Sequence, residues 1–147
     1  MLPESIELII VTPERQLLRE TVVEVTLPGA DGQLGVLPGH APLITELGIG
    51  ELVYRTKSAS EVVHLAIISG FAEVLGDRVT ALAETAERPE EIDVARAEQA
   101  RKRAEQRLAA AASDPSVDWD RASVALQRAL IRIQVARRRS SVRVASE

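Results

Sequence analysis

Short apolar runs separated by turn signals fill the first 88 residues of the chain. The runs are rich in Val, Ile and Leu, which suit extended strands, and Pro, Gly or Asp stands between them. Many short strands at such spacing indicate an antiparallel β-sandwich or barrel, and an open sheet with loops is the less favoured alternative. The expected strand segments are 6–11, 17–18 joined to 22–27, 49–55, 62–68, 70–74 and 79–83.

The most unusual stretch of this half is residues 32–43, in which three glycines and two prolines surround a short apolar run. Glycine adopts positive φ freely, whereas proline fixes φ near −65° and lacks an N–H group. We therefore expect the chain to bend before Leu34, run extended to Leu37 and bend again. Residues 76–78 carry a second turn signal and predict a hairpin between two strands.

The pattern changes at Pro89 from strand-like to helical. Asp93 is a suitable N-cap, and the eighteen positions after it contain neither Gly nor Pro. Pro115 lies in a break, and Asp118 is suited to cap a second helix. Apolar residues recur every three or four positions, as in an antiparallel helical hairpin. The expected seams are Val94, Ala97, Ala100, Ala104, Leu108 and Ala111, and then Ala122, Leu126, Ala129, Ile133 and Ala136.

The predicted fold class is therefore α+β, with a β-sandwich domain over residues 1–88 and a helical hairpin domain over residues 89–147. The hairpin seam is mostly alanine. Burying one methyl or methylene group contributes about 0.8 kcal/mol, against roughly 1.5–3 kcal/mol for a leucine or isoleucine. We expect the hairpin to be held weakly and to be the mobile part of the chain.

Charge divides the chain in a similar way. Residues 1–92 carry 15 acidic and 6 basic side chains, a net charge of −9, while residues 93–147 carry 7 acidic and 12 basic ones, a net charge of +5. The absence of cysteine excludes disulfides and thiolate chemistry and fits a reducing compartment. We expect neither a membrane span, which needs roughly 20 apolar residues, nor a basic signal peptide.

No catalytic constellation is visible in the sequence. There is no H-x-x-x-H, no G-x-S-x-G and no P-loop, and neither catalytic residues nor a metal site are predicted. His64 lies within an apolar strand pattern, where a structural role is the simplest interpretation. An unrecognised hydrolase stays open as an alternative, but the chain offers no nucleophile–base pair for it.

The arginines of the helical half carry more information. Arg96 and Arg103 are seven residues apart on one helix, and Arg128 and Arg132 are four apart on the other, so each pair shares a helix face. Guanidinium groups suit phosphates, but spacing alone favours a solvated charged face. A nucleic-acid-binding adaptor that uses the basic tail is another alternative. It predicts steep salt dependence, and the acidic first half argues against it.

Several motifs resemble the epsilon subunit of bacterial and chloroplast ATP synthases. They are Gly32-x-x-Gly35-Val36-Leu37-Pro38-Gly39-His40-Ala41-Pro42-Leu43, then residues 69–74 (SGFAEV), then 78–83 (RVTALA). The resemblance covers nearly the whole chain and implies an N-terminal β-sandwich followed by a helical hairpin. It also implies a non-catalytic rotor subunit of the central stalk that couples proton flow to ATP synthesis.

The resemblance implies partners for both halves. In the family, the sandwich binds the gamma subunit and sits on the c-subunit ring, so the loop from Asp31 onwards would meet the ring, with Gln33 and His40 in the contact. Gln33 stands where some relatives have an acidic residue. The implied location is peripheral, at the cytoplasmic face of the bacterial cell membrane, with no nucleic acid bound.

The family's hairpin can extend into the alpha/beta catalytic head and inhibit ATP hydrolysis. Basic residues of its second helix face the beta subunits there; the matching residues are Arg121, Arg128, Arg132, Arg137, Arg138 and Arg139. In some relatives the folded hairpin binds ATP as a regulatory ligand through Ile-Asp-x-x-Arg-Ala. Residues 92–97 complete this motif, and the implied ATP-binding set is Glu87, Ile92, Asp93, Arg96, Ala97, Arg103, Arg128 and Arg132. A purely structural stalk subunit without ATP sensing is the alternative within the family.

Overall fold

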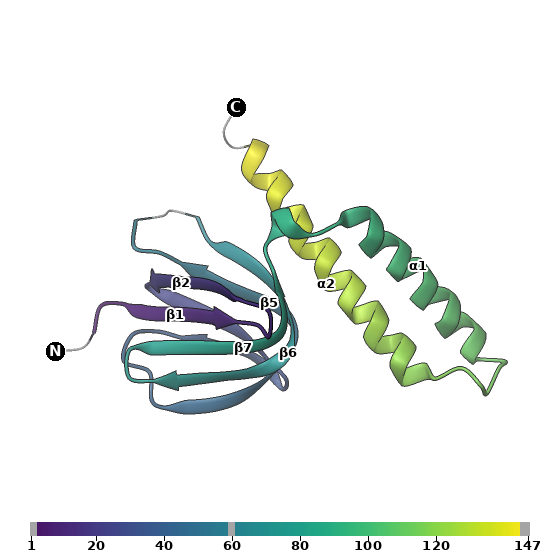
Figure 1. The fold of residues 1–147 in the computed structure, drawn as a ribbon, viewed down its shortest axis with the longest axis horizontal. Coiled ribbons are helices and arrows are strands. Elements are labelled where there is room, and N and C mark those ends of the chain that lie inside the picture. Colours follow the sequence, from purple (N-terminus) through teal and green to yellow (C-terminus); the bar gives the residue numbers. More distant parts are fainter. Residues whose placement is uncertain (1–2, 59–60, 145–147) are drawn as a thin grey trace. The chain divides into compact units, whose positions relative to one another are not determined.

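The computed structural model describes residues 3–58 and 61–144, with side chains described only as far as Arg138 in the last helix. The chain separates into two compact units, residues 1–87 and 88–147. The first contains seven strands, and the second contains a short 3-10 helix and two long α-helices (Figure 1). The strands are β1 (Ile6–Val11), β2 (Gln16–Val22), β3 (Glu24–Gly29), β4 (Gly32–Val36), β5 (Leu43–Arg55), β6 (Val63–Leu75) and β7 (Arg78–Glu87).

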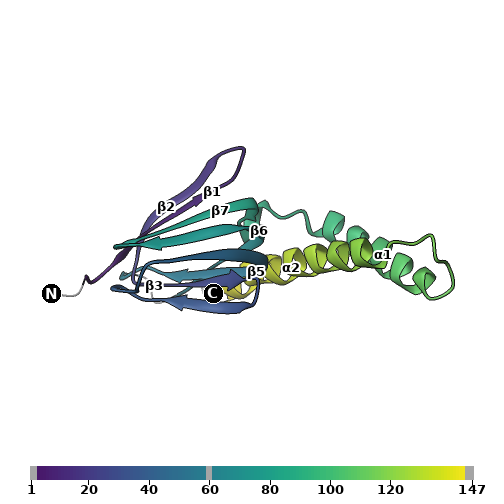
Figure 2. The same cartoon turned by 90° about the horizontal axis from the view of Figure 1, so that it is seen from below.

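The strands form one continuous ladder in the order β2-β1-β7-β6-β5-β3-β4. All neighbouring pairs are antiparallel except β1 and β7, which are parallel. In the parallel pair the first strand of the chain lies beside the last, and the other five strands come between these two in sequence but not in the sheet. The ladder curls around a common interior to make the sandwich (Figures 1 and 2), which confirms the predicted fold.

A change in which side chains face the interior shows where the ladder bends. On β6, the core residues are Leu65 and Ile67 before the bend and Ala72 and Val74 after it. Successive strand residues face opposite sides, so a change from odd to even numbers requires a local break in the pleat. The same change occurs between Leu47 and Leu52 on β5 and between Ala83 and Ala86 on β7.

Ser69 and Gly70 form the bend on β6. Both have positive φ, 57° and 135°, and Ser69 is absent from the pairing of β6 with either neighbour. Gly70 pairs with Leu47 on one side and Ala83 on the other, so the bend crosses all three long strands in one line. A side chain at Gly70 would collide with the backbone of Leu82 and approach the Ala83 Cα within 2.8 Å. Glycine is therefore required there.

Aliphatic side chains fill the interior of the sandwich, as the near absence of aromatic residues requires. Leu8, Ile10, Leu27, Leu52 and Ile67 each have 0% exposure. Tyr54 is the one aromatic residue of this core among the described side chains. Each fully buried leucine or isoleucine stabilises the sandwich by roughly 1.5–3 kcal/mol.

Four of the expected strand segments were wrong in their boundaries. The expected 22–27 segment breaks at Val23, so that β2 ends and β3 begins there. Pro28 does not stop the strand but lies inside β3, because the β3–β5 register is irregular between Thr26 and Gly29 and needs no N–H group from proline. The expected segments 62–68 and 70–74 form the single strand β6, and 49–55 is the second half of β5.

The second unit begins with η1 (Pro89–Glu91), followed by α1 (Val94–Ala111) and α2 (Trp119–Val144). The Asp93 carboxylate accepts the Arg96 N–H at 3.1 Å, and that of Asp118 accepts the Arg121 N–H at 3.0 Å, so both predicted caps are confirmed. Antiparallel packing of α1 and α2 makes a helical hairpin (Figure 1). Neither helix, over the residues described, is long and apolar enough to cross a membrane.

The seam between the helices follows the alanine pattern. Its buried members are Ala97 and Ala104 on α1 and Ala122, Ala129, Ile133 and Ala136 on α2. Val94 was predicted on this seam but is 47% exposed. It stands three residues before Ala97, which turns it by about 60° away from the line that joins Ala97 to Ala104.

Candidate functional site

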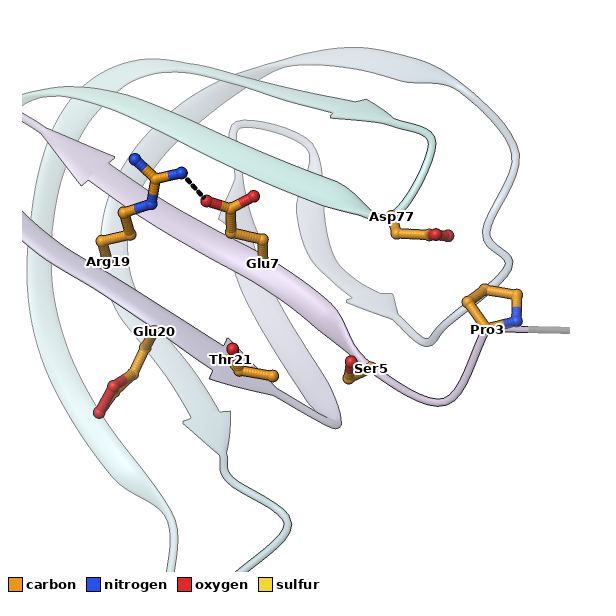
Figure 3. A pocket seen from close by; sticks show the side chains of 7 residues that line it. All are labelled: Pro3, Ser5, Glu7, Arg19, Glu20, Thr21 and Asp77. Atoms are coloured by element: carbon orange, nitrogen blue, oxygen red, sulfur yellow. Dashed lines mark ion pairs between the residues drawn. The ribbon is translucent and has the colours of Figure 1, made fainter.

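A shallow hollow of about 350 Å³ lies where β1, β2 and the β6–β7 turn meet, lined by six polar residues and Pro3 (Figure 3). At its centre, Glu7 forms ion pairs with Arg19 and Arg78, and the Arg78 Nη2–Glu7 Oε2 distance is 3.2 Å. Partial desolvation raises the pKa of Glu7, but hydrogen bonds and charge from Arg78 and Arg19 outweigh it, so the pKa is lowered. These pairs link β1 to both of its neighbours, β2 and β7, and so hold the three strands together.

Replacing Glu7 with Gln is expected to lower the urea midpoint of unfolding at neutral pH. A lowered pKa in the folded state means that the carboxylate stabilises the fold above its unfolded-state pKa, and that this contribution disappears as pH falls through the folded-state pKa. The difference between E7Q and the unmodified chain should therefore shrink in acid. Glu20→Gln is the control, because Glu20 lines the same hollow but points away from the Glu7–Arg19 pair (Figure 3). An equal effect of both substitutions would contradict this assignment.

The residues expected to meet the c-ring lie on and around β4. Asp31 lies in the turn between β3 and β4, Gln33 is the second residue of β4, and His40 lies in the connection from β4 to β5. The His40 Nδ1 atom is 2.7 Å from the Ala41 carbonyl oxygen, and the His40 N–H donates to the Leu37 carbonyl at 3.1 Å, closing a turn with Gly39 at φ 87°. The turn presents Leu37, which is 61% exposed, at the surface.

One outer face of the sandwich carries several exposed apolar side chains. The cross-strand row Glu46–Phe71–Leu82–Val11 runs over β5, β6, β7 and β1. Phe71 and Leu82 are 58% and 55% exposed, and Ile44 nearby on β5 is 72% exposed. Exposed apolar groups gathered on one face, with carboxylates such as Glu46 beside them, are typical of a protein contact surface.

The Ile-Asp-x-x-Arg-Ala motif forms the start of α1. Ile92 and Ala97 are buried at 7% and 4% exposure, and Asp93 caps the helix through its side chain. Arg96 is exposed. Three of these residues therefore already have a structural role in the hairpin, and Arg96 is the member whose side chain is available to a ligand.

Helix geometry shows how the arginines are distributed over the hairpin. Glu98 and Arg101 of α1 line a hollow together with Leu130 and Arg137 of α2. The flank of α1 that carries Glu98 and Arg101 and the flank of α2 that carries Leu130 and Arg137 therefore lie on the same side of the hairpin. At 100° per residue, residues on the other flank of each seam must share the opposite side. These are the predicted nucleotide-binding arginines, Arg96, Arg103, Arg128 and Arg132.

We call this set the arginine face. Antiparallel packing places Arg103 at about the level of Arg128 and Arg132, with Arg96 about 10 Å further along the hairpin axis. Arg128 and Arg132 are half-buried, and Arg96 and Arg103 are exposed. Glu87, the remaining predicted ligand residue, lies at the end of β7 in the first unit.

The arginines predicted to contact the beta subunits do not share one face. Arg121 lies in line with Arg128 and Arg132 on α2, at intervals of seven and four residues. Arg137 lies on the opposite side of the hairpin, beside Leu130. Arg138 is exposed and turned about 100° from Arg137, while the side chain of Arg139 lies outside the described residues.

Sequence reasoning missed Arg101 and the hollow beside it. Arg101 Nη2 lies 2.8 Å from Glu98 Oε2, and its Nη1 lies 3.7 Å from Glu105 Oε1. The i, i+3 and i, i+4 spacing of these charges was the available signal. Within the described part of the chain, no group of three or more His, Cys, Asp or Glu side chains is placed to hold a metal ion.

Comparisons with known proteins match both units to the same family. The family model "ATP synthase, Delta/Epsilon chain, beta-sandwich domain" matches residues 5–89, and "ATP synthase, Delta/Epsilon chain, long alpha-helix domain" matches residues 90–137. The "ATP synthase epsilon chain" of Syntrophobacter fumaroxidans is 50% identical over 90% of this chain and 96% of its own length. That of Koribacter versatilis is 56% identical over 71% of this chain and 72% of its own length.

A solved structure shows the same fold in an assembled enzyme. A chain of the Euglena gracilis mitochondrial ATP synthase, described as "OSCP/F1/c-ring in rotational state 1", superposes with a TM-score of 0.74 at 26% identity, covering 86% of this chain and 78% of that one. The sandwich, the hairpin and their order along the chain are thus accounted for together. The chain belongs to the ATP synthase delta/epsilon chain family.

Proposed function

We propose that this chain is a non-catalytic rotor subunit of the ATP synthase central stalk, where it couples proton flow to ATP synthesis. The observation that carries the proposal is the match of both domains, in order, to one family and to curated epsilon chains over 90% of the chain. Membership of that family favours this role over the nucleic-acid-binding adaptor and the unrecognised hydrolase. The test is reconstitution with an epsilon-depleted ATP synthase, in which the chain should restore ATP-driven proton pumping.

In this proposal the sandwich makes the contacts with the c-ring and the gamma subunit. The Euglena chain that it resembles comes from an assembly of F1 with the c-ring. We assign the turn with Leu37 and His40, and the β3–β4 turn with Asp31 and Gln33, to the ring contact. The apolar face of Phe71, Leu82 and Ile44 is assigned to the gamma subunit, because its exposed apolar area needs a protein partner. The location that follows is peripheral, on the cytoplasmic face of a bacterial membrane.

We further propose that the hairpin is an ATP-sensitive inhibitor of ATP hydrolysis. The arginine face supports ATP binding, since it directs four guanidinium groups to one side of the hairpin and these suit a triphosphate. In its extended form, the same α2 arginines together with Arg121 would contact the acidic beta subunits. Arg128 and Arg132 are needed for both contacts, so ATP and the catalytic head would compete for them.

The energies make such a switch feasible. A ligand at 100 times its dissociation constant stabilises the state that it binds by about 2.7 kcal/mol. Two conformers separated by a few kcal/mol are redistributed by that amount. The buried small residues Ala97, Ala104, Ala122, Ala129 and Ala136 support the proposal, because an alanine seam gains little from burial and so favours a small gap between the folded and open hairpin.

Calorimetric titration of the chain with ATP tests the regulatory proposal. Saturable binding should be weakened about tenfold or more in Arg128→Ala, because a charge-assisted hydrogen bond to phosphate contributes on the order of 1.5–3 kcal/mol. Arg101→Ala is the matched control, since Arg101 lies on the opposite side of the hairpin and should leave ATP affinity unchanged. Absence of binding at millimolar ATP would leave the rotor role in place and favour the purely structural alternative.

A further inference from the structure

The hairpin is tied at the end where α1 begins as well as at the end where the two helices are joined. The short helix η1, which leads into α1, packs against α2. Over its eighteen residues α1 has two buried side chains, Ala97 and Ala104, and an alanine gains little from burial. The contacts at the two ends therefore have a large share in keeping α1 on α2.

One glutamate holds η1 in shape. The Glu91 carboxylate accepts the backbone N–H of Arg88 at 3.1 Å, and the Glu91 N–H donates to the Arg88 carbonyl at 3.0 Å. The two side chains also form an ion pair, with 3.6 Å between Arg88 Nη1 and Glu91 Oε1. A helix of three residues has too few internal hydrogen bonds to be stable alone, so the order of η1 depends on these contacts.

An ordered η1 positions the first turn of α1. Ile92 is the one residue between η1 and the Asp93 cap, and it is 7% exposed. Asp93 in turn caps α1 through the Arg96 N–H. Loss of η1 would therefore leave the first turn of α1 without the element that positions it, while the later turns would keep their contacts with α2.

The other end of the hairpin is closed more firmly. The chain itself joins the helices there, and Asp114 Oδ1 accepts both the N–H and the hydroxyl of Ser116, at 2.9 and 2.6 Å. Asp118 then caps α2 through the Arg121 N–H. Separation of the two helices is therefore expected to begin at the η1 end, where the contacts are all non-covalent.

We propose that the Arg88–Glu91 pair is the latch of the hairpin: it keeps η1 on α2, and its release begins the separation of α1 from α2. Both residues belong to the second unit. The effect of the latch on the enzyme rests on the proposed inhibitory function, whereas its effect on hairpin opening does not. Arg96 of the arginine face lies in the first turn of α1, so a nucleotide held between Arg96 and the α2 arginines would close the same end.

Hydrogen exchange of the full chain tests the latch. In Glu91→Ala, the amides of residues 96–100 should exchange about fivefold faster or more, as expected for the loss of a capping contact. The amides of residues 105–111 and of the β-strands should keep their protection. Glu90→Ala is the matched control, because it removes the same charge from the adjacent residue, which is exposed and forms no ion pair within the described part of the chain.

A conservative variant separates the ion pair from the hydrogen bond. Glu91→Gln should give an intermediate effect, since its amide oxygen still accepts the Arg88 N–H but carries no charge. Raising the salt concentration should speed the exchange of residues 96–100 in the unmodified chain and leave it unchanged in Glu91→Gln. A purely structural role of the Glu91 side chain would give no such difference in salt dependence.

Three results would overturn the proposal: an equal effect of Glu90→Ala, faster exchange spread evenly over both helices in Glu91→Ala, or loss of strand protection in Glu91→Gln. A separate measurement concerns the enzyme. In reconstituted ATP synthase, Glu91→Ala should inhibit ATP hydrolysis more strongly than the unmodified chain at the same ATP concentration. Faster exchange of residues 96–100 without any change in hydrolysis would support the latch and contradict the proposed inhibitory function.

Discussion

Gly70→Ala is expected to abolish the folded sandwich. The added Cβ would overlap the Leu82 carbonyl and lie 2.8 Å from the Ala83 Cα, and these are backbone atoms of the paired strand β7 that cannot rotate away. The backbone at Gly70 also has a φ of 135°, which side chains with L chirality rarely adopt. The steric overlap and the unfavourable φ both occur at the bend where the ladder of strands folds over. The expected loss in the free energy of unfolding exceeds about 4 kcal/mol, a size that single substitutions reach only through a severe defect such as this clash.

Two other glycines make this prediction specific. Gly76→Ala should cost about 1–2 kcal/mol, because its φ is 61° but nothing lies within 4 Å of the added Cβ. Gly35→Ala, with open space and no positive φ, should change stability by no more than about 0.5 kcal/mol. Urea unfolding of the three variants measures the series. A cost at Gly70 no greater than that at Gly76 would show that β7 yields to the added side chain.

The same bend shows what sequence patterns can and cannot predict in this fold. Apolar alternation found the strand material, because each half of β5, β6 and β7 keeps a period of two over a few residues. The alternation could not show that the two halves belong to one strand. At Ser69 and Gly70 the core-facing positions change from odd to even numbers, and in the sequence this looks like the end of one strand and the start of another. The prediction that Pro28 ends its strand was wrong for a related reason. Only the pairing with the partner strand shows that the N–H group that proline lacks is not needed there.

The candidate nucleotide site was predictable in its composition but not in its arrangement. Asp93 as a cap and the buried Ala97 follow from local helix chemistry, so they were visible in the sequence. Whether Arg96 and Arg103 share a side with Arg128 and Arg132 depends on how the two seams dock. The hollow beside Arg101 shows that the opposite flanks of the two helices meet, and the helix period then places these four arginines together on the other side. The prediction for Val94 was wrong because Val94 stands three residues before Ala97, whereas the buried seam residues of α1, Ala97 and Ala104, are seven apart.

Ala129→Leu is expected to open the hairpin while leaving the sandwich folded. Ala129 is 1% exposed in the alanine seam, where three further heavy atoms have no room between closely packed helices. Overpacking of this kind costs typically about 1–3 kcal/mol. Among the described side chains of α1 and α2, Ile131, Ile133 and Val135 are the only buried ones larger than alanine, so little apolar burial is available to absorb such a cost, and the two units are compact separately. Hydrogen exchange should show faster exchange of amides in α1 and α2, with β-strand protection unchanged.

Ala110→Leu is the control for this variant, because Ala110 is exposed on α1 and the three added heavy atoms there meet solvent. If the folded hairpin is the state that binds ATP, saturating nucleotide should restore part of the lost protection in Ala129→Leu, by about 2.7 kcal/mol at 100 times the dissociation constant. The rescue should disappear when Arg128→Ala is added to Ala129→Leu. Faster exchange throughout both units would instead mean that the hairpin and the sandwich unfold together, and the weak alanine seam would then not be the element that a ligand can switch.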